Sequence, residues 1–262
     1  MDSKPRRSVD RQFANTLERG LRVLGCFSGS LPELGNREIS EATGLPKPTV
    51  SRLTHTLIEL GYLRRRSDSA RFELGTGVLS LGYPVLAGLL HFRRIATPHM
   101  AALAKGIDGT CTVAVRDRMQ MVSIESVTER DVLKRKPGAG LTIHFAVSTP
   151  GLAWTIGATA PERERALREV AHAQPESLDE LREEVDRCFK LQLRDGYIAR
   201  HGKNRPDTWV LSTTLKRRPG EELLVLSCAL DAPAARAQSL EHAAGVKLLA
   251  AARSIGEAMA QR

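Results

Sequence analysis

Side chains that can hydrogen-bond to the edges of nucleic-acid bases share one face of a predicted helix over residues 48–60. This polar face carries Thr49, Ser51, Arg52, His55 and Thr56. Short hydroxyl groups with an arginine near the start of a helix suit a recognition helix, because its N-terminal residues reach base edges in the major groove. The opposite face is apolar, with Val50, Leu53, Leu57 and Leu60 at helical spacing. That stripe predicts packing against the rest of a small domain.

Positive charge flanks this helix along the chain. Residues 44–72 include six basic side chains and two acidic ones. Three consecutive arginines fall in a predicted hairpin, where they could contact a phosphate backbone. The candidate DNA-binding residues are Arg37, Lys47, Pro48, Thr49, Ser51, Arg52, His55, Arg64, Arg65, Arg66 and Arg71. A small helical bundle with a solvated polar face is the alternative explanation of the same pattern.

The neighbouring elements have the order of a winged helix-turn-helix. Leucines at helical spacing predict a first helix over residues 17–27, and the Gly and Pro residues of SGSLPELG end it. We expect a second helix over residues 37–44, capped by Asn36 and ended by Gly44. Pro48 suits the first turn of the third helix, because its missing N–H would be unpaired there. The segment YLRRRSDSARFEL, two extended runs around a polar turn, predicts a β-hairpin.

Helix and strand patterns alternate after the hairpin, which predicts a larger α+β domain. An apolar connector over residues 78–90, which Pro84 should kink or interrupt, leads into a helix over residues 91–105. The strand-like runs are TCTVAVRD, QMVSIESV, DVLKR, LTIHFAV, TWVLSTTLK and ELLVLSCAL, and the helical stretches cover residues 149–158, 161–172, 178–194 and 239–260. The expected organisation is a disordered basic arm over 1–14, a winged helix-turn-helix over 15–75, a linker helix over 76–92 and a second domain over 93–262.

Composition narrows the classes of function. The 262 residues carry a formal net charge of +9, which favours partners with phosphate or carboxylate groups. The four cysteines, Cys26, Cys111, Cys188 and Cys228, are too far apart for a zinc-ligand pair, so we expect no metal and no cofactor. The chain has no signal-peptide core and no apolar run of membrane length, which predicts a soluble cytoplasmic protein. It also lacks the motifs of hydrolases, metalloproteases, dinucleotide enzymes and kinases, so we expect no enzyme.

Three segments together resemble the IclR-type family of bacterial transcription regulators. They are TLERGLRVLGCFS, REISEATGLPKPTVSRLTHTLIELGYL and RFELGTGVLSLG, and the resemblance extends more weakly to the C-terminus. It implies an N-terminal winged helix-turn-helix, a linker helix and a C-terminal GAF-like α/β effector-binding domain. It also implies homodimers or homotetramers on palindromic operators. Thr49 and Arg52 match the DNA-facing pattern of this family.

The resemblance also implies an effector pocket formed by a loop, the helix after it and two later strands. The segment GLTIHFAVSTPGLAW keeps Gly140 and Gly151 of the family pattern, whereas His144 and Ser148 stand where Pro and Thr are usual. The expected effector-binding residues are His144, Phe145, Ser148, Thr213 and Ser227. The predicted helix start near Ser148 favours a small anion, such as an organic acid or an aromatic catabolite. Nearby cations add to this expectation: Lys134, Arg135, Lys136, Arg200, Lys203 and Arg205.

The expected partners are therefore double-stranded operator DNA, a small-molecule effector and a second copy of the chain. Self-association is expected because the connector carries more aliphatic side chains than one solvated helix should. An architectural DNA-binding protein without a ligand is one alternative. An enzyme of unknown class is the other.

Overall fold

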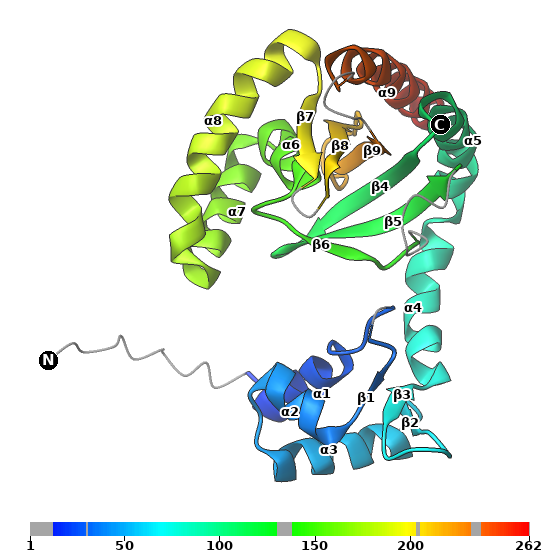
Figure 1. The fold of residues 1–262 in the computed structure, drawn as a ribbon, viewed down its shortest axis with the longest axis vertical. Helices are drawn as coiled ribbons and strands as arrows, with labels where there is room; N and C mark the ends of the chain where they lie inside the picture. The colour runs from blue at the N-terminus through cyan, green and yellow to red at the C-terminus, as the bar shows by residue number, and fades with distance from the viewer. Residues whose placement is uncertain (1–12, 30, 130–137, 203–204, 232–236, 262) are drawn as a thin grey trace, which may run out of the picture. The chain divides into compact units, whose positions relative to one another are not determined.

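The computed structural model describes residues 13–29, 31–129, 138–202, 205–231 and 237–261. The chain divides into two compact units, Met1–Gly88 and Leu89–Arg262, each with its own hydrophobic core (Figure 1). The arm expected over residues 1–14 and the strand-like run DVLKR fall almost entirely outside the described residues. No helix in the described part of the chain is both long and apolar enough to cross a membrane.

The first unit has the helices and strands of a winged helix-turn-helix. Its elements are α1 (Asn15–Leu24), β1 (Glu33–Leu34), α2 (Asn36–Thr43), α3 (Lys47–Glu59), β2 (Leu63–Arg65), β3 (Phe72–Leu74) and α4 (Thr76–Gly88). The strands form an antiparallel sheet in the order β1-β3-β2. Val23 of α1, Ile39 of α2 and Val50 of α3 are fully buried in a common core with Phe72. This core holds α3 against the other helices by its apolar stripe.

The turn between α2 and α3 depends on Gly44. Its φ of +68° lies in the left-handed region, which glycine adopts without steric cost. Its N–H donates to the carbonyl of Ser40 at 2.9 Å and closes α2. The expected cap at the start of α2 is corrected, because Asn36 is already helical and Gly35 precedes it. Glu38 caps the helix instead, since its carboxylate accepts the Gly35 N–H at 2.7 Å.

Two further differences from the sequence-based expectation lie around α1. The helix ends at Leu24, before Gly25, rather than at residue 27. The segment after it contains the short strand β1, which no local pattern indicates. Glu33 and Leu34 become a strand because they pair with Glu73 and Phe72 of β3, far along the chain.

The connector forms helix α4, which runs through Pro84 and has no buried residue. The helical run breaks at Leu89, where α4 ends and α5 follows, rather than at the proline. Proline removes one backbone hydrogen bond of the helix, and the other bonds of the helix remain.

The second unit is a six-stranded antiparallel sheet covered by helices on both faces. Its elements are α5 (Leu90–Ile107), β4 (Thr110–Asp117), β5 (Gln120–Thr128), β6 (Thr142–His144), α6 (Thr149–Gly157), α7 (Ala160–Ala173), η1 (Pro175–Ser177), α8 (Leu178–Asp195), β7 (Ile198–Gly202), β8 (Arg205–Thr214), β9 (Leu224–Asp231) and α9 (Ala237–Ala260). The strand order is β6-β5-β4-β9-β8-β7, so β6 and β7 are the two edges. Strand β7 is absent from the sequence-based expectation, since the short run IARHG shows little alternation.

Strand alternation divides the interior of this unit into two cores. Helices α5 and α9 cover one face, where Val113, Leu211 and Leu226 are buried (Figure 1). Helix α6 covers the other face together with α7 and α8. The core on that face includes Ala114 and Val225. Neighbouring residues of one strand therefore belong to different cores, and this decides which polar side chains can reach a site on the α6 face.

Candidate nucleic-acid interface and ligand cavity

Helix α3 exposes the polar face expected from the sequence. Lys47, Ser51, Arg52 and His55 are exposed and Thr49 is half-buried, while Val50 and Leu57 face the core. The Arg52 side chain has no hydrogen bond or ion pair with any described residue. An arginine of this kind keeps all five N–H donors for a partner outside the chain.

The arginines of the β2–β3 hairpin differ in the ion pairs that they form. Arg66 binds Glu33 and Asp68, each at 2.8 Å, and it lowers the pKa of Asp68 to about 2. Arg71 binds the Glu38 carboxylate. These contacts hold the hairpin against β1 and α2, so Arg66 and Arg71 serve the fold of this unit.

The other three candidate arginines, Arg64 and Arg65 on the hairpin and Arg37 on α2, are more exposed than this pair. Arg64 contacts Glu73 at 2.9 Å, yet its side chain is 67% exposed. Arg65 is exposed and lies over the Phe72 ring at 5.5 Å, with no ion pair to a described residue. Arg37 on α2 is paired with Glu41, the residue one turn later, at 2.8 Å. Among the three consecutive arginines, Arg65 is thus the one that forms no ion pair with a described residue, so its charge is the most available to a partner outside the unit.

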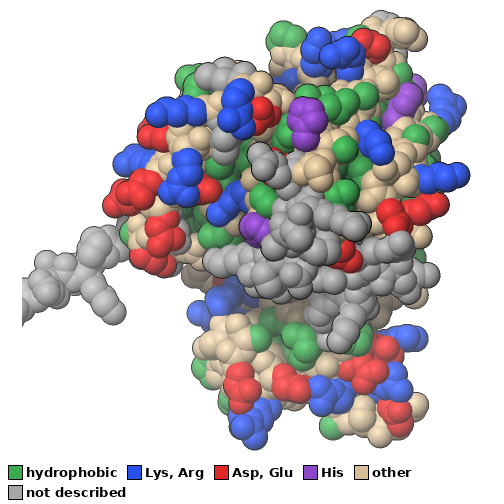
Figure 2. Space-filling model, turned by 45° about the horizontal axis from the view of Figure 1, so that its top comes forward, with side chains coloured by type: hydrophobic (Ala, Val, Ile, Leu, Met, Phe, Trp, Pro, Cys, Tyr) green, Lys and Arg blue, Asp and Glu red, His purple; other side chains and the backbone are tan. Residues whose placement is uncertain are grey.

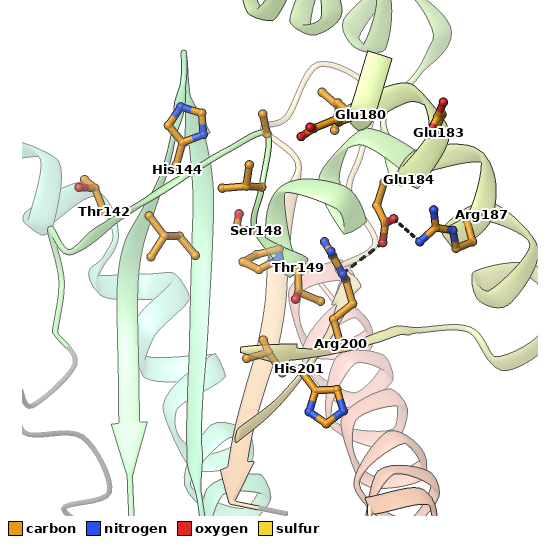
Figure 3. Close-up of a pocket in the computed structure, with 16 residues that line it drawn as sticks. Thr142, His144, Ser148, Thr149, Glu180, Glu183, Glu184, Arg187, Arg200 and His201 are labelled. Carbon is orange, nitrogen blue, oxygen red and sulfur yellow. Dashed lines mark ion pairs between the residues drawn. The ribbon is translucent and has the colours of Figure 1, made fainter. Parts of the chain in front are cut away.

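The second unit contains a cavity of about 810 Å³. Its lining residues are Thr142, Ile143, His144, Ala146, Val147, Ser148, Thr149, Pro150, Glu180, Leu181, Glu183, Glu184, Arg187, Arg200, His201 and Val210 (Figure 3). Both edge strands of the sheet, β6 and β7, contribute to it, together with α8 and the start of α6. The sheet must therefore curl, since its two edges line one cavity.

The structure brings together only part of the expected effector-binding set. His144 and Ser148 line the cavity. Phe145 lies below the lining, fully buried against the Trp154 ring, with the Arg116 guanidinium 4.5 Å from its centroid. Its role in this structure is to pack the core under α6.

Thr213 and Ser227 lie outside the cavity lining. Thr213 shares a strand face with Leu211, which packs under α5 and α9, and its hydroxyl donates to the Gly196 carbonyl at 2.9 Å. Ser227 does face α6, but it is buried and its hydroxyl is 2.8 Å from that of Ser212. Neither residue lines this cavity, because strand alternation turns Thr213 to the face under α5 and α9 and Ser227 is buried beneath α6.

Ser148 has a structural use at the cavity wall. Its Oγ accepts the N–H of Gly151 at 3.2 Å and so caps α6. Pro150 has no N–H to offer, so the first turn has few unpaired donors left. Gly151 permits this arrangement, since a Cβ there would lie 1.9 Å from the Phe145 carbonyl oxygen. The helix N-terminus is thus a weaker anion site than the sequence suggested.

The charges of the cavity come from β7 and α8, and Arg200 is one of the cations expected near the pocket. Arg200 of β7 and Arg187 of α8 both contact Glu184, at 3.2 and 2.8 Å (Figure 3). Glu180 and Glu183 of α8 also line the wall. Of the cations expected near the pocket, Lys134, Arg135, Lys136 and Lys203 lie outside the described residues, as does the side chain of Arg205.

Two other polar groups belong to this region. The Nδ1 atom of His144 is buried without a hydrogen-bond partner among the described residues. The Cys188 thiol contacts Glu184 Oε1 at 3.6 Å, and burial together with that carboxylate raises the pKa of Cys188 to about 11. The thiol is therefore protonated at neutral pH and donates to Glu184.

Arg200, expected near the pocket as one of several cations, reaches the cavity through the face that it occupies on β7. It lies two residues after the fully buried Ile198 and so shares its face. Glu184 lies three residues after Leu181 on α8, beside the buried side of that helix. Overall charge was a poorer guide, because Lys and Arg are interspersed with Asp and Glu on the visible face (Figure 2).

Comparison with known proteins places this architecture. Residues 16–67 match the IclR helix-turn-helix domain. The transcriptional regulator TsaQ1/TsaQ2 of Comamonas testosteroni is 36% identical over 189 residues, which cover 71% of this chain and 67% of that protein. The crystal structure of an IclR family regulator from Brucella abortus is 35% identical, with a TM-score of 0.76 over 95% of this chain and 94% of that one.

A more distant structure shares the fold alone. It is an IclR homologue from Microbacterium hydrocarbonoxydans in complex with 4-hydroxybenzoate, 21% identical, with a TM-score of 0.63 over 91% of this chain and 99% of that one. The matches to the C. testosteroni and B. abortus proteins confirm the predicted fold class and a regulator of transcription rather than an enzyme. The chain belongs to the IclR family of transcriptional regulators.

Proposed function

We propose that this regulator reads its operator through α3 and the β2–β3 hairpin, and that a small organic ligand in the second unit changes its affinity for DNA. The exposed polar face of α3 supports the DNA-reading part, with Ser51 and Arg52 near the helix start. Bacterial operators are in the cytoplasm, where we expect the protein to act. The DNA partner is a duplex, since a recognition helix fits the major groove of B-form DNA.

The cavity is the single observation that carries the ligand-controlled part. Its volume of about 810 Å³ lies within the ~300–1,000 Å³ range of small-molecule sites. Its wall combines apolar side chains, such as Val147 and Val210, with a few polar groups, as ligand sites usually do. The 4-hydroxybenzoate complex of the M. hydrocarbonoxydans homologue makes a small carboxylic acid a reasonable class of ligand.

Control of DNA binding requires a difference in affinity between two arrangements of the protein. A ligand that binds both equally shifts nothing, however tightly it binds. A differential affinity of five- to 150-fold, about 1–3 kcal/mol, is typical of such coupling. The ligand therefore needs no chemical step, only unequal contacts in the two arrangements.

The experiment begins by selecting and sequencing the genomic DNA that the full chain retains. The operator is then defined by footprinting, and its affinity is measured by fluorescence anisotropy while carboxylic acids are titrated. We expect at least one small carboxylic acid to change operator affinity five-fold or more, with no change for the non-specific DNA control. A purely architectural protein would retain DNA without a defined footprint, and no acid would alter its affinity; that result would contradict the proposal.

A further inference from the structure

The cavity holds a carboxylate of its own beside its best-placed cation. Arg200 leaves edge strand β7 and points toward α8, where Glu184 meets it (Figure 3). Building on the ligand site proposed above, we infer that Glu184 occupies the anion-binding position of Arg200 and that the carboxylate of the ligand competes with Glu184 for it. Glu184 then sets both the affinity and the charge preference of the site.

The contact between Arg200 and Glu184 is loose. Its shortest approach, from Nε to Glu184 Oε1, is 3.2 Å, whereas charge-assisted bonds of this type measure about 2.7–2.9 Å. The Arg200 side chain is 36% exposed and lines the cavity, so its remaining donors stay within reach of a bound molecule. A planar guanidinium binds a carboxylate best through two parallel N–H···O bonds. A mobile ligand can adopt this two-bond geometry more freely than the Glu184 side chain, which is fixed on α8.

Release of Arg200 would not leave Glu184 unpaired. Its Oε2 contacts Arg187 at 2.8 Å, and its Oε1 accepts from the Cys188 thiol at 3.6 Å. The Glu184 side chain is only 18% exposed, so a carboxylate without partners would be costly there. Because Arg187 and Cys188 stay in place, exchange at Arg200 replaces one charge-assisted contact by another.

The rest of the wall specifies the class of ligand further. Ala146, Val147 and Val210 offer apolar surface in the cavity that Arg200 lines, which suits a hydrocarbon body attached to the carboxylate. Glu180 and Glu183 add negative charge to the α8 wall, which disfavours a second anionic group. The ligand class is therefore a monocarboxylic acid with an apolar body.

The test compares variants of the full-length protein by calorimetric titration. Benzoate is the probe, and benzyl alcohol is the neutral control of similar shape. We expect E184Q to bind benzoate at least ten-fold more tightly than the natural sequence, with benzyl alcohol changed less than three-fold. Adding R200Q to E184Q should abolish the gain. R182Q is the matched control, because Arg182 is an exposed arginine of α8 outside the cavity lining; its benzoate affinity should change less than three-fold.

Thermal melting checks that each variant folds. E184D provides a second route, since it keeps the charge beside Arg187 but shortens its reach to Arg200, and it should also tighten benzoate binding. Equal or weaker benzoate binding by E184Q and E184D, including no binding at all, would overturn the inference. An equal gain for benzyl alcohol would overturn it too, because it would reflect space rather than charge. The operator titrations decide the proposed function separately, since they score DNA affinity with the unaltered chain.

Discussion

At the scale of single residues, Arg52 differs from Arg37, Arg66 and Arg71. Those three arginines are engaged in ion pairs within the first unit, whereas Arg52 has no such partner among the described residues. It also stands in the first half of α3, the part of a recognition helix that reaches base edges. Its planar fork matches the O6 and N7 acceptors of guanine.

We therefore predict that R52A lowers operator affinity by about 1–3 kcal/mol and relaxes specificity at one position of each half-site. Fluorescence anisotropy on the operator, on single-base variants and on random DNA measures this. R37A is the control, because Arg37 is exposed but already paired with Glu41. Equal losses for R52A on operator and random DNA would show that Arg52 contacts only phosphate.

At the scale of elements, adjacent arginines of the β2–β3 hairpin have different roles. Arg66 ties the hairpin to β1 through Glu33, whereas Arg65 keeps its charge exposed. We predict that R65A lowers the slope of log affinity against log salt by about one unit on every DNA sequence, since it removes one phosphate contact. R66A should instead lower the melting temperature of the first unit.

Salt titrations with operator and random DNA, paired with thermal melts, separate these two effects. The R64A variant gives an intermediate comparison, because Arg64 is exposed but contacts Glu73. An unchanged salt slope in R65A would remove this side chain from the DNA interface. A normal melting temperature in R66A would contradict the role given to the ion pairs with Glu33 and Asp68.

At the scale of the whole molecule, α4 has the exposed apolar surface that is typical of a protein–protein interface. None of its residues is buried, and the side chains of Leu79, Leu81 and Val85 are exposed by 67%, 61% and 66%. A helix that is apolar on all sides is normally covered. We propose that a second copy of the chain covers it, because a two-fold dimer also offers two recognition helices to two half-sites, about one DNA turn apart.

Analytical ultracentrifugation at micromolar concentration should therefore show a dimer. The double variant L79E/V85E should sediment as a monomer and lose at least ten-fold in operator affinity. L60E serves as the control, since Leu60 is 60% exposed but lies outside α4. A natural chain that stays monomeric with and without operator DNA would rule out this assembly.

The sequence by itself was sufficient for features that depend on neighbours along the chain. The left-handed turn at Gly44 and the order of helices and hairpin follow from local spacing, and the structure has both. The apolar stripe of α3 holds for Val50 and Leu57, whereas Leu60, expected in the same stripe, lies beyond the end of the helix and is 60% exposed. The family resemblance rested on the same local segments. Even Pro84 was correctly located in a helical connector, although the break lies at Leu89.

Only the tertiary structure decided which side chains share the cavity. Ser148, Glu184 and Arg200 come from three separate segments, and their meeting depends on how the sheet curls and how α8 packs. Thr213 lies outside the cavity because its position along β8 turns it to the other face of the sheet, and a shift of one residue along a strand is enough to change the face. Strands β1 and β7 escaped prediction because a strand is stabilised by a partner distant in the chain, whereas a helix makes its hydrogen bonds within itself.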